Sequence, residues 1–101
     1  MEVICKEINN KKYIKLNGNL DGLSSNEVTN KILEEIKDDS EIIIDMENCP
    51  YVSSAGLRTL LTVGKSIKMK NGRMSIINLV DEVKDIMDVT GFANIFKSFE
   101  R

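Results

Sequence analysis

The chain has 101 residues, a net charge of −2 at pH 7 and no histidine. A chain of this length is expected to form one domain, residues 1–101, around a single hydrophobic core. The lack of histidine excludes a Ser-His-Asp or Cys-His nucleophile pair and a histidine-ligated metal site. A self-contained hydrolase is therefore not expected. We expect a protein that is not an enzyme and that has no cofactor and no metal.

Charge is unevenly spread: residues 1–50 carry six basic and eleven acidic side chains, and residues 51–101 carry eight and five. The near-neutral total argues against a chain that mainly binds nucleic acid or an anionic membrane. Cys5 and Cys49 form no CxxC pair, so neither a zinc site nor a disulfide is indicated. Cys49 is interpreted as a buried or idle thiol, with a redox switch as the alternative.

No apolar run approaches the roughly 18 residues that a membrane span requires, and the N-terminus lacks a basic region followed by an apolar segment. A cytoplasmic protein is the expectation. The first elements are two short strands, over residues 3–7 and about 12–16, where side chains alternate in character. They are joined by a tight turn at Asn9-Asn10.

A helix is predicted to follow. Ser24 can cap it, Glu27 three residues later completes a capping box, and Leu23 can pack on Val28 as a hydrophobic staple. The apolar face of this helix should consist of Val28, Ile32, Leu33 and Ile36.

The next two elements are a strand and a second helix. The β-branched run 42–44, with Met46, is typical of a strand covered on both faces. The helix should begin near Ser53 or Ser54, run to about Lys70 and end at Asn71-Gly72. Its buried face should hold Leu57, Leu60, Val63, Gly64 and Ile67, and its opposite face Ser54, Arg58, Thr62, Lys65 and Met69.

A further strand and helix complete the chain. Met74, Ile76 and Ile77 predict the strand. The helix, ended by Gly91, should bury Val80, Val83, Ile86, Met87 and Val89, and Ile95, Phe96 and Phe99 should close the core. The order β-β-α-β-α-β-α predicts an α/β sandwich with a mostly parallel, four- to five-stranded sheet and helices packed against it.

The junction of residues 52–57 is the candidate functional site. In open α/β sheets, function gathers at the carboxyl ends of strands, where helix N-termini present free N–H groups that tolerate a phosphate. Gly56 in the first helical turn costs roughly 1 kcal/mol relative to alanine. That cost is explained if another backbone or a partner approaches closely there. Simple N-capping by Ser53 is the alternative interpretation of the junction.

Two motifs resemble the STAS domain family, particularly its stand-alone bacterial anti-sigma-factor antagonists. Gly18-Asn19-Leu20-Asp21 is similar to the family's G-x-L-D. The segment 51–58, Tyr-Val-Ser-Ser-Ala-Gly-Leu-Arg, with Leu60-Leu61 behind it, is similar to the family's phosphorylation-loop signature. The resemblance covers nearly the whole chain and implies a STAS-like sandwich.

The resemblance also implies a phosphorylation site. The family carries Asp-Ser-Ser/Thr-Gly-Leu, with the phosphoacceptor directly after the Asp. Here Ser53 takes the Asp position, Ser54 the acceptor position and Ala55 the second hydroxyl position. Ser54 is therefore the implied acceptor, with Ser53 as the fallback, and the family's carboxylate is missing.

The function implied is partner switching. The unphosphorylated chain would bind an anti-sigma factor that is also an ATP-dependent serine kinase, which frees the sigma factor. Phosphorylation of Ser54 would switch this binding off, and a metal-dependent serine phosphatase would restore it. The residues expected at the partner surface are Asp21, Ser53, Ala55, Gly56, Arg58, Leu61 and Lys65, with Leu61 exposed.

Plainer interpretations stay open. Asp21 before Gly22 is equally a turn-forming residue, and the charges on the second helix are equally a solvated face. One rival function is a STAS adaptor subunit that regulates a transporter or signalling complex without phosphorylation. Another is a small nucleotide- or phosphate-binding enzyme that uses the same helix N-terminus, although no Gly-rich phosphate loop is present.

Overall fold

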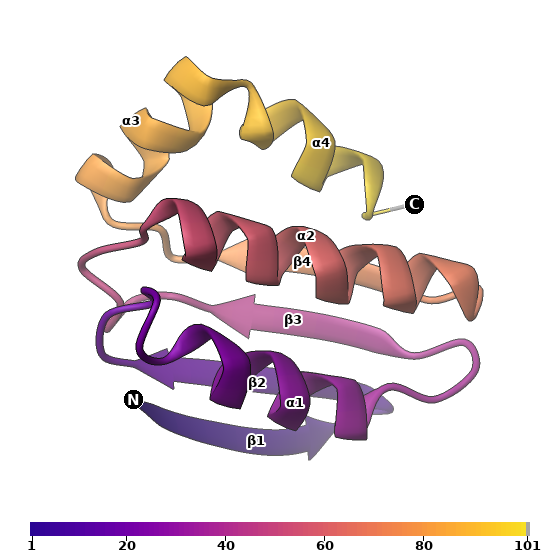
Figure 1. The fold of residues 1–101 in the computed structure, drawn as a ribbon. Coiled ribbons are helices and arrows are strands. Elements are labelled where there is room, and N and C mark those ends of the chain that lie inside the picture. Colours follow the sequence, from indigo (N-terminus) through magenta and orange to yellow (C-terminus); the bar gives the residue numbers. More distant parts are fainter. Residues whose placement is uncertain (101) are drawn as a thin grey trace.

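The computed structural model describes residues 1–100 and contains one four-stranded sheet in the order β1-β2-β3-β4. The strands are β1 (Glu2–Ile8), β2 (Lys11–Asn17), β3 (Glu41–Asp45) and β4 (Arg73–Ile77). The helices are α1 (Ser25–Glu35), α2 (Ser54–Met69), α3 (Asp81–Thr90) and α4 (Phe92–Ser98). The predicted α/β class and element order are confirmed, with α4 as one further helix at the end (Figure 1).

The sheet is mostly parallel, as predicted. β1 and β2 form an antiparallel hairpin, and both β2 with β3 and β3 with β4 pair in parallel. Asn9 and Asn10 link the hairpin with φ angles of 52° and 66°. Two consecutive positive φ angles match a two-residue hairpin turn, whose backbone twist suits the twist of the strands.

All four helices lie on one face of the sheet, and the core lies between them and the strands (Figure 1). On β3, Ile42 and Ile44 are fully buried, whereas Ile43 between them is only partly buried. The prediction that this strand is covered on both faces is therefore wrong. A run of β-branched residues favours an extended backbone whether its side chains are buried or exposed. It therefore does not show whether one face of the strand or both are covered by helices.

The start of α1 also differs from the prediction. Ser24 is the N-cap residue, but its hydroxyl makes no cap bond. It donates instead to the Asn19 carbonyl at 2.7 Å and accepts the Asp21 N–H at 3.1 Å. Leu23 is 97% exposed, so no hydrophobic staple forms. Of the predicted apolar face Val28, Ile32 and Ile36 are buried, while Leu33 is exposed.

Helix α2 is built as predicted. Its five expected core residues are all buried, and the five on the opposite face are all exposed. The helix ends at Met69, and Asn71 just after it takes the positive φ of 62°. Gly72 is required for a different reason, because a Cβ there would lie 2.4 Å from the Ser40 carbonyl oxygen.

Helices α3 and α4 cover the β4 side of the core. Val83 and Met87 of α3 are buried, but Ile86 and Val89 are exposed, so the predicted buried face of this helix is too wide. Gly91 ends α3 with a φ of 81°, as expected. Phe96 and Phe99 are buried and close the core, and Ile95 is 41% exposed.

Within residues 1–100, no helix is long and apolar enough to cross a membrane. The same residues contain no group of three or more cysteine, aspartate or glutamate side chains arranged to hold a metal ion.

The one-sided core predicts unequal effects at neighbouring positions of β3. Ile44→Ala should lower the free energy of unfolding by about 2–5 kcal/mol, since it leaves a cavity at a fully buried site. Ile43→Ala, on the opposite face, should cost about 1 kcal/mol or less. Urea unfolding at low protein concentration measures both. Equal losses would mean that the two faces of the strand are equally buried.

Candidate functional site

The backbone at Leu20 holds the segment that precedes α2. The Leu20 N–H donates to the Tyr51 carbonyl at 3.0 Å, and the Leu20 carbonyl accepts the Ser53 N–H at 2.9 Å. Leu20 and Val52 form an isolated parallel bridge. Two residues before Leu20, the Gly18 N–H donates to the Asn48 carbonyl at 3.0 Å. The two predicted motifs, residues 18–21 and 51–58, are therefore hydrogen-bonded to each other.

Gly56 allows this arrangement. A Cβ at Gly56 would lie 2.3 Å from the Leu20 carbonyl oxygen and 2.9 Å from side-chain atoms of Leu20 and Val52. Gly56 is buried. Of the two explanations offered for this glycine, the close approach of another backbone is the one observed, and that backbone belongs to the chain itself.

Ser53 caps α2. Its φ and ψ of −87° and 177° are extended, and its Oγ accepts the Gly56 N–H at 3.3 Å. Its carbonyl accepts the Leu57 N–H at 2.9 Å. The capping interpretation is thus confirmed for Ser53, which supplies the acceptor oxygen that an aspartate could also provide at an N-cap.

Ser54 is the first residue of α2, and its side chain is exposed. In the part of the chain that the structure describes, its hydroxyl makes no intramolecular hydrogen bond. No acidic residue lies in the first turn of the helix. Ser53 and Ser54 thus differ sharply, since one hydroxyl holds the helix end and the other projects from the positive end of the helix dipole.

Asp21 forms the turn that leads from the Leu20 segment into α1. Its Oδ1 accepts the Leu23 N–H at 3.0 Å and the Ser24 N–H at 3.2 Å. The turn-forming interpretation is confirmed. Because Asp21 directly follows Leu20, which is hydrogen-bonded to Ser53, Asp21 lies close to the start of α2. A contact between Asp21 and a partner protein stays a prediction.

The exposed face of α2 begins at Ser54. Arg58 and Lys65 continue it and are exposed, and Ala55 is partly buried. Leu61 was expected to be exposed, but it is partly buried and packs against the core. The reason is its position on the helix wheel, which places it between the outward residues and the buried Leu57 and Leu60 rather than at the centre of the outer face.

A polar groove that no sequence motif predicted lies beside this face, between α1 and α2. Its volume is about 260 Å³. It is lined by Ser25, Asn26, Thr29, Ala55, Arg58, Thr59 and Thr62. At its floor the Thr29 and Thr59 hydroxyls lie 3.1 Å apart, and the Thr29 hydroxyl donates to the Ser25 carbonyl at 2.7 Å. The sequence feature that could have indicated this groove is Thr59, a polar residue on the apolar face of α2.

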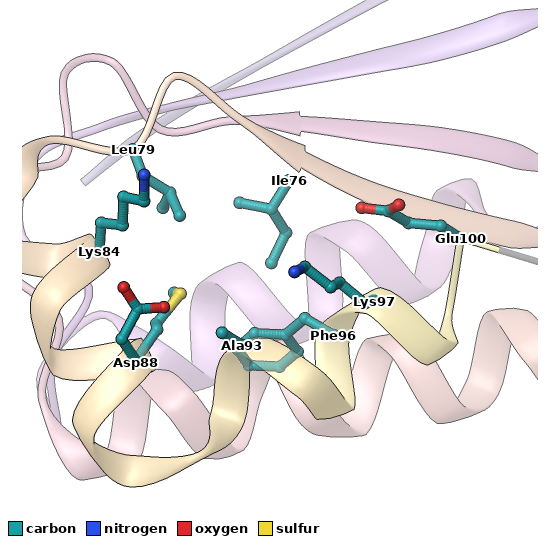
Figure 2. A pocket seen from close by; sticks show the side chains of 9 residues that line it. Ile76, Leu79, Lys84, Asp88, Ala93, Phe96, Lys97 and Glu100 are labelled. Carbon is teal, nitrogen blue, oxygen red and sulfur yellow. The ribbon is translucent and has the colours of Figure 1, made fainter.

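A second hollow is apolar and lies away from Ser54, between β4, α3 and α4 (Figure 2). Its volume is about 170 Å³, and its lining includes Ile76, Leu79, Met87, Ala93 and Phe96. The rim carries two pairs of opposite charges. Lys84 and Asp88 lie at one part of the rim, and Lys97 and Glu100 lie at another. Such a hollow can accept one apolar side chain, and its balanced rim selects no ligand charge.

Neither cysteine is activated. Cys49 is buried, and burial raises the pKa of its thiol. Its Sγ donates to the Tyr51 carbonyl at 3.5 Å. Desolvation also raises the pKa of the Cys5 thiol, and the nearby Glu35 carboxylate adds to this shift. The interpretation of Cys49 as a buried thiol is confirmed, and a raised pKa disfavours the thiolate that redox chemistry needs.

Comparisons with known proteins agree on one family. The model of the STAS domain matches residues 2–101. A Bordetella bronchiseptica protein, provisionally named anti-sigma factor antagonist BtrV, is 32% identical over 60 residues, which cover 59% of this chain and 52% of the relative. The match thus spans about half the length of that curated relative.

Two solved structures illustrate the range of proteins that share the fold. One is a provisionally named anti-sigma factor antagonist from Thermotoga maritima, with a TM-score of 0.85 and 14% identity over 92% of this chain and 81% of that one. The other is the murine anion transporter Slc26a9, with a TM-score of 0.74 and 16% identity over 82% of this chain and 14% of the transporter. Identities this low show the fold alone.

The close approach at Gly56 predicts that Gly56→Ala destabilises the chain by about 3 kcal/mol, the upper end of the usual cost of overpacking. The Leu20 carbonyl cannot withdraw without losing its bond to Ser53. Thermal or urea unfolding measures the loss. Gly22→Ala is the matched control, because a Cβ there meets no atom within 4 Å, and it should leave stability nearly unchanged.

The raised thiol pKa values predict how the cysteines react. In the native protein, Ellman's reagent should label Cys5 slowly and Cys49 not at all, and denaturant should release both. Because a raised pKa leaves little thiolate at neutral pH, the Cys5 rate should rise about tenfold per pH unit until the pH reaches that pKa. Cys5→Ser should abolish native labelling. Fast labelling of Cys49 in the native state would contradict its burial.

Proposed function

The chain belongs to the STAS domain family, as the motifs at residues 18–21 and 51–58 predicted, and on this premise we propose that it is an anti-sigma-factor antagonist switched by phosphorylation of Ser54. The observation that carries the proposal is the division of roles between two neighbouring serines. Ser53 is occupied as the helix cap, and Ser54 is exposed with a free hydroxyl. The B. bronchiseptica relative supports the partner class by its name.

The surface around Ser54 supports an acidic or polar partner. Helix α2 contains three basic residues and no acidic residue. Arg58 and Lys65 lie on the same exposed face as Ser54, and the partly buried Leu61 adds apolar area to it. The groove beside this face is lined by hydroxyl groups. A partner segment that presents carboxylates at the basic side chains and hydrogen-bonding groups at the groove matches this pattern.

The phosphorylation step needs only a hydroxyl from this chain. The Ser54 Oγ attacks the γ-phosphorus of ATP bound to the partner kinase, the bond from that phosphorus to the β–γ bridging oxygen breaks, and ADP leaves. The hydroxyl proton passes to a base on the kinase. The products are phosphoserine at position 54 and ADP. The chain therefore acts as the substrate of the kinase, and the phosphatase would return the hydroxyl by hydrolysis.

The phosphate would act mainly at the interface. It adds about −1.5 to −2 charges at pH 7. The positive end of α2 favours an anion at Ser54, and Arg58 one turn later can pair with it, so we expect little change in the fold. A partner with carboxylates at this surface would be repelled, and Arg58 would no longer be available to it. A penalty of about 3 kcal/mol weakens binding roughly a hundredfold.

The proposal predicts which serine is labelled. When the chain is incubated with ATP and an anti-sigma factor that is a serine kinase, phosphopeptide mapping should find phosphate on Ser54. Ser54→Ala should abolish labelling and leave stability nearly unchanged, since this hydroxyl has no intramolecular bond. Ser53→Ala should still be labelled but should lose about 1 kcal/mol of stability with its cap. Labelling that survives in Ser54→Ala would contradict the assignment.

The partner surface can be tested separately from the phosphate. Arg58→Glu should weaken binding of the anti-sigma factor at least about tenfold in calorimetry, because it places a carboxylate where we expect another carboxylate. Lys84→Glu makes the same charge change on α3 and serves as the control that should bind normally. Equal binding by both variants would place the partner elsewhere.

The alternative function is a STAS adaptor subunit that regulates a transporter or signalling complex without phosphorylation. The likeness of the fold to part of the anion transporter Slc26a9 supports this alternative. The same surface of α2 could serve an adaptor. The two functions differ in the outcome of the labelling experiment, since an adaptor binds its partner without incorporating phosphate at Ser54.

A further inference from the structure

The face of the sheet opposite the helices is open and amphipathic. Its apolar side chains include Ile4 at 36% exposure, Ile8 at 51% and Ile77 at 36%, with Tyr13 and Ile43 partly buried at the centre. Its charged side chains are Glu2, Lys6, Lys11, Lys15, Glu41, Asp45 and Arg73, as the alternation of each strand requires. In Figure 1 this face lies behind the sheet as drawn, away from all four helices.

The strand register arranges these side chains in three rows across the sheet. One row runs Ile8, Lys11, Glu41, Arg73; the middle row runs Lys6, Tyr13, Ile43, Ser75; the third runs Ile4, Lys15, Asp45, Ile77. On the two central strands, each outer row places a lysine on β2 beside a carboxylate on β3. The Lys11 Nζ and a Glu41 carboxylate oxygen lie 3.8 Å apart.

We propose that two copies of this chain pack these open faces together as a symmetric dimer, with the two-fold axis parallel to the strands and between β2 and β3. This axis brings β2 of one copy over β3 of the other and keeps the rows in register. Lys11 then faces the second copy's Glu41, and Lys15 faces its Asp45. In each outer row, the lysine and the carboxylate of one copy therefore lie opposite the carboxylate and the lysine of the other. The four side chains form a square in which the charges alternate in sign.

The apolar residues match under the same operation. Tyr13 faces the second copy's Ile43 at the centre, and Ile4 faces its Ile77 at one corner. The remaining pairs are Lys6 with Ser75 and Ile8 with Arg73. The aliphatic part of the Arg73 side chain can cover Ile8. The opposed sheets would rotate by about 30° because each is twisted, and the long lysine side chains can follow that rotation.

The charge pattern rejects the other face-to-face symmetry. A two-fold axis across the strands would place β2 over β2 and β3 over β3 with the rows exchanged. Lys11 would then face Lys15, and Glu41 would face Asp45. Like charges placed opposite one another are unfavourable in a partly buried interface. The arrangement with alternating charges is the one that the sequence of this face supports.

The size of the face sets the strength of the dimer. Strands about 4.8 Å apart and five to seven residues long give a face of roughly 20 Å by 20 Å. This is below the usual area of a stable interface, so the dimer should be weak and populated at roughly 100 µM and above. Because the helices lie on the other side of each sheet, the dimer leaves both copies of Ser54 accessible (Figure 1). The proposal is independent of the phosphorylation switch.

The experiment is a charge exchange between Lys11 and Glu41, followed by sedimentation velocity from about 10 µM to about 1 mM. Lys11→Glu alone and Glu41→Lys alone should each dimerise at least about tenfold more weakly, because the square at positions 11 and 41 then holds four charges of the same sign. An equimolar mixture of the two variants should dimerise again, since one copy supplies the negative charges and the other the positive ones. The double variant K11E/E41K should also recover.

Lys84→Glu on α3 makes the same change in net charge as Lys11→Glu and serves as the control that should dimerise as the parent chain does. The variants should fold normally, since exposed pairs such as Lys11–Glu41 contribute little stability. A parent chain that stays monomeric throughout the range would overturn the proposal. So would self-association by either single variant that equals the parent, or a mixture that fails to recover.

Discussion

The contact between the Leu20 carbonyl and the start of α2 is the constraint on which the site depends. This carbonyl accepts the Ser53 N–H, and it fits only because Gly56 has no Cβ. The bond fixes where α2 begins, and therefore which serine caps the helix and which one projects from it. It also ties the two motifs together, so that the turn at Asp21 lies next to the loop.

This constraint explains how Ser53 can serve at the position where the resemblance to the family motif implies an aspartate. At an N-cap, a serine hydroxyl and a carboxylate can both accept a backbone N–H, so the substitution at Ser53 keeps the helix start intact. It removes one negative charge next to Ser54. In the proposed switch this chain supplies an accessible hydroxyl and a stable scaffold around it, and the base and the metal would belong to other proteins.

Packing all the helices on one face has consequences beyond the core. It leaves a sheet surface where apolar residues alternate with charges, and on the two central strands the register places Lys11 beside Glu41 and Lys15 beside Asp45. The apolar hollow beside β4 is a further consequence, because α3 and α4 reach past the last strand of the sheet. The exposed face of α2 around Ser54, the open face of the sheet and this hollow involve different elements, so changes at one need not disturb the others.

The sequence by itself determined the element order, the buried face of α2, the hairpin turn and the Ser53–Ser54 junction, because these depend on local periodicity and on residues that favour particular backbone angles. It overestimated burial at Leu23, Ile43 and Val89, because an apolar side chain is buried only where another layer lies over it. It also missed the Thr29–Thr59 contact, which joins residues thirty positions apart. Only the tertiary structure decided which faces have a neighbouring layer, and it showed that Gly56 makes room for the chain's own backbone.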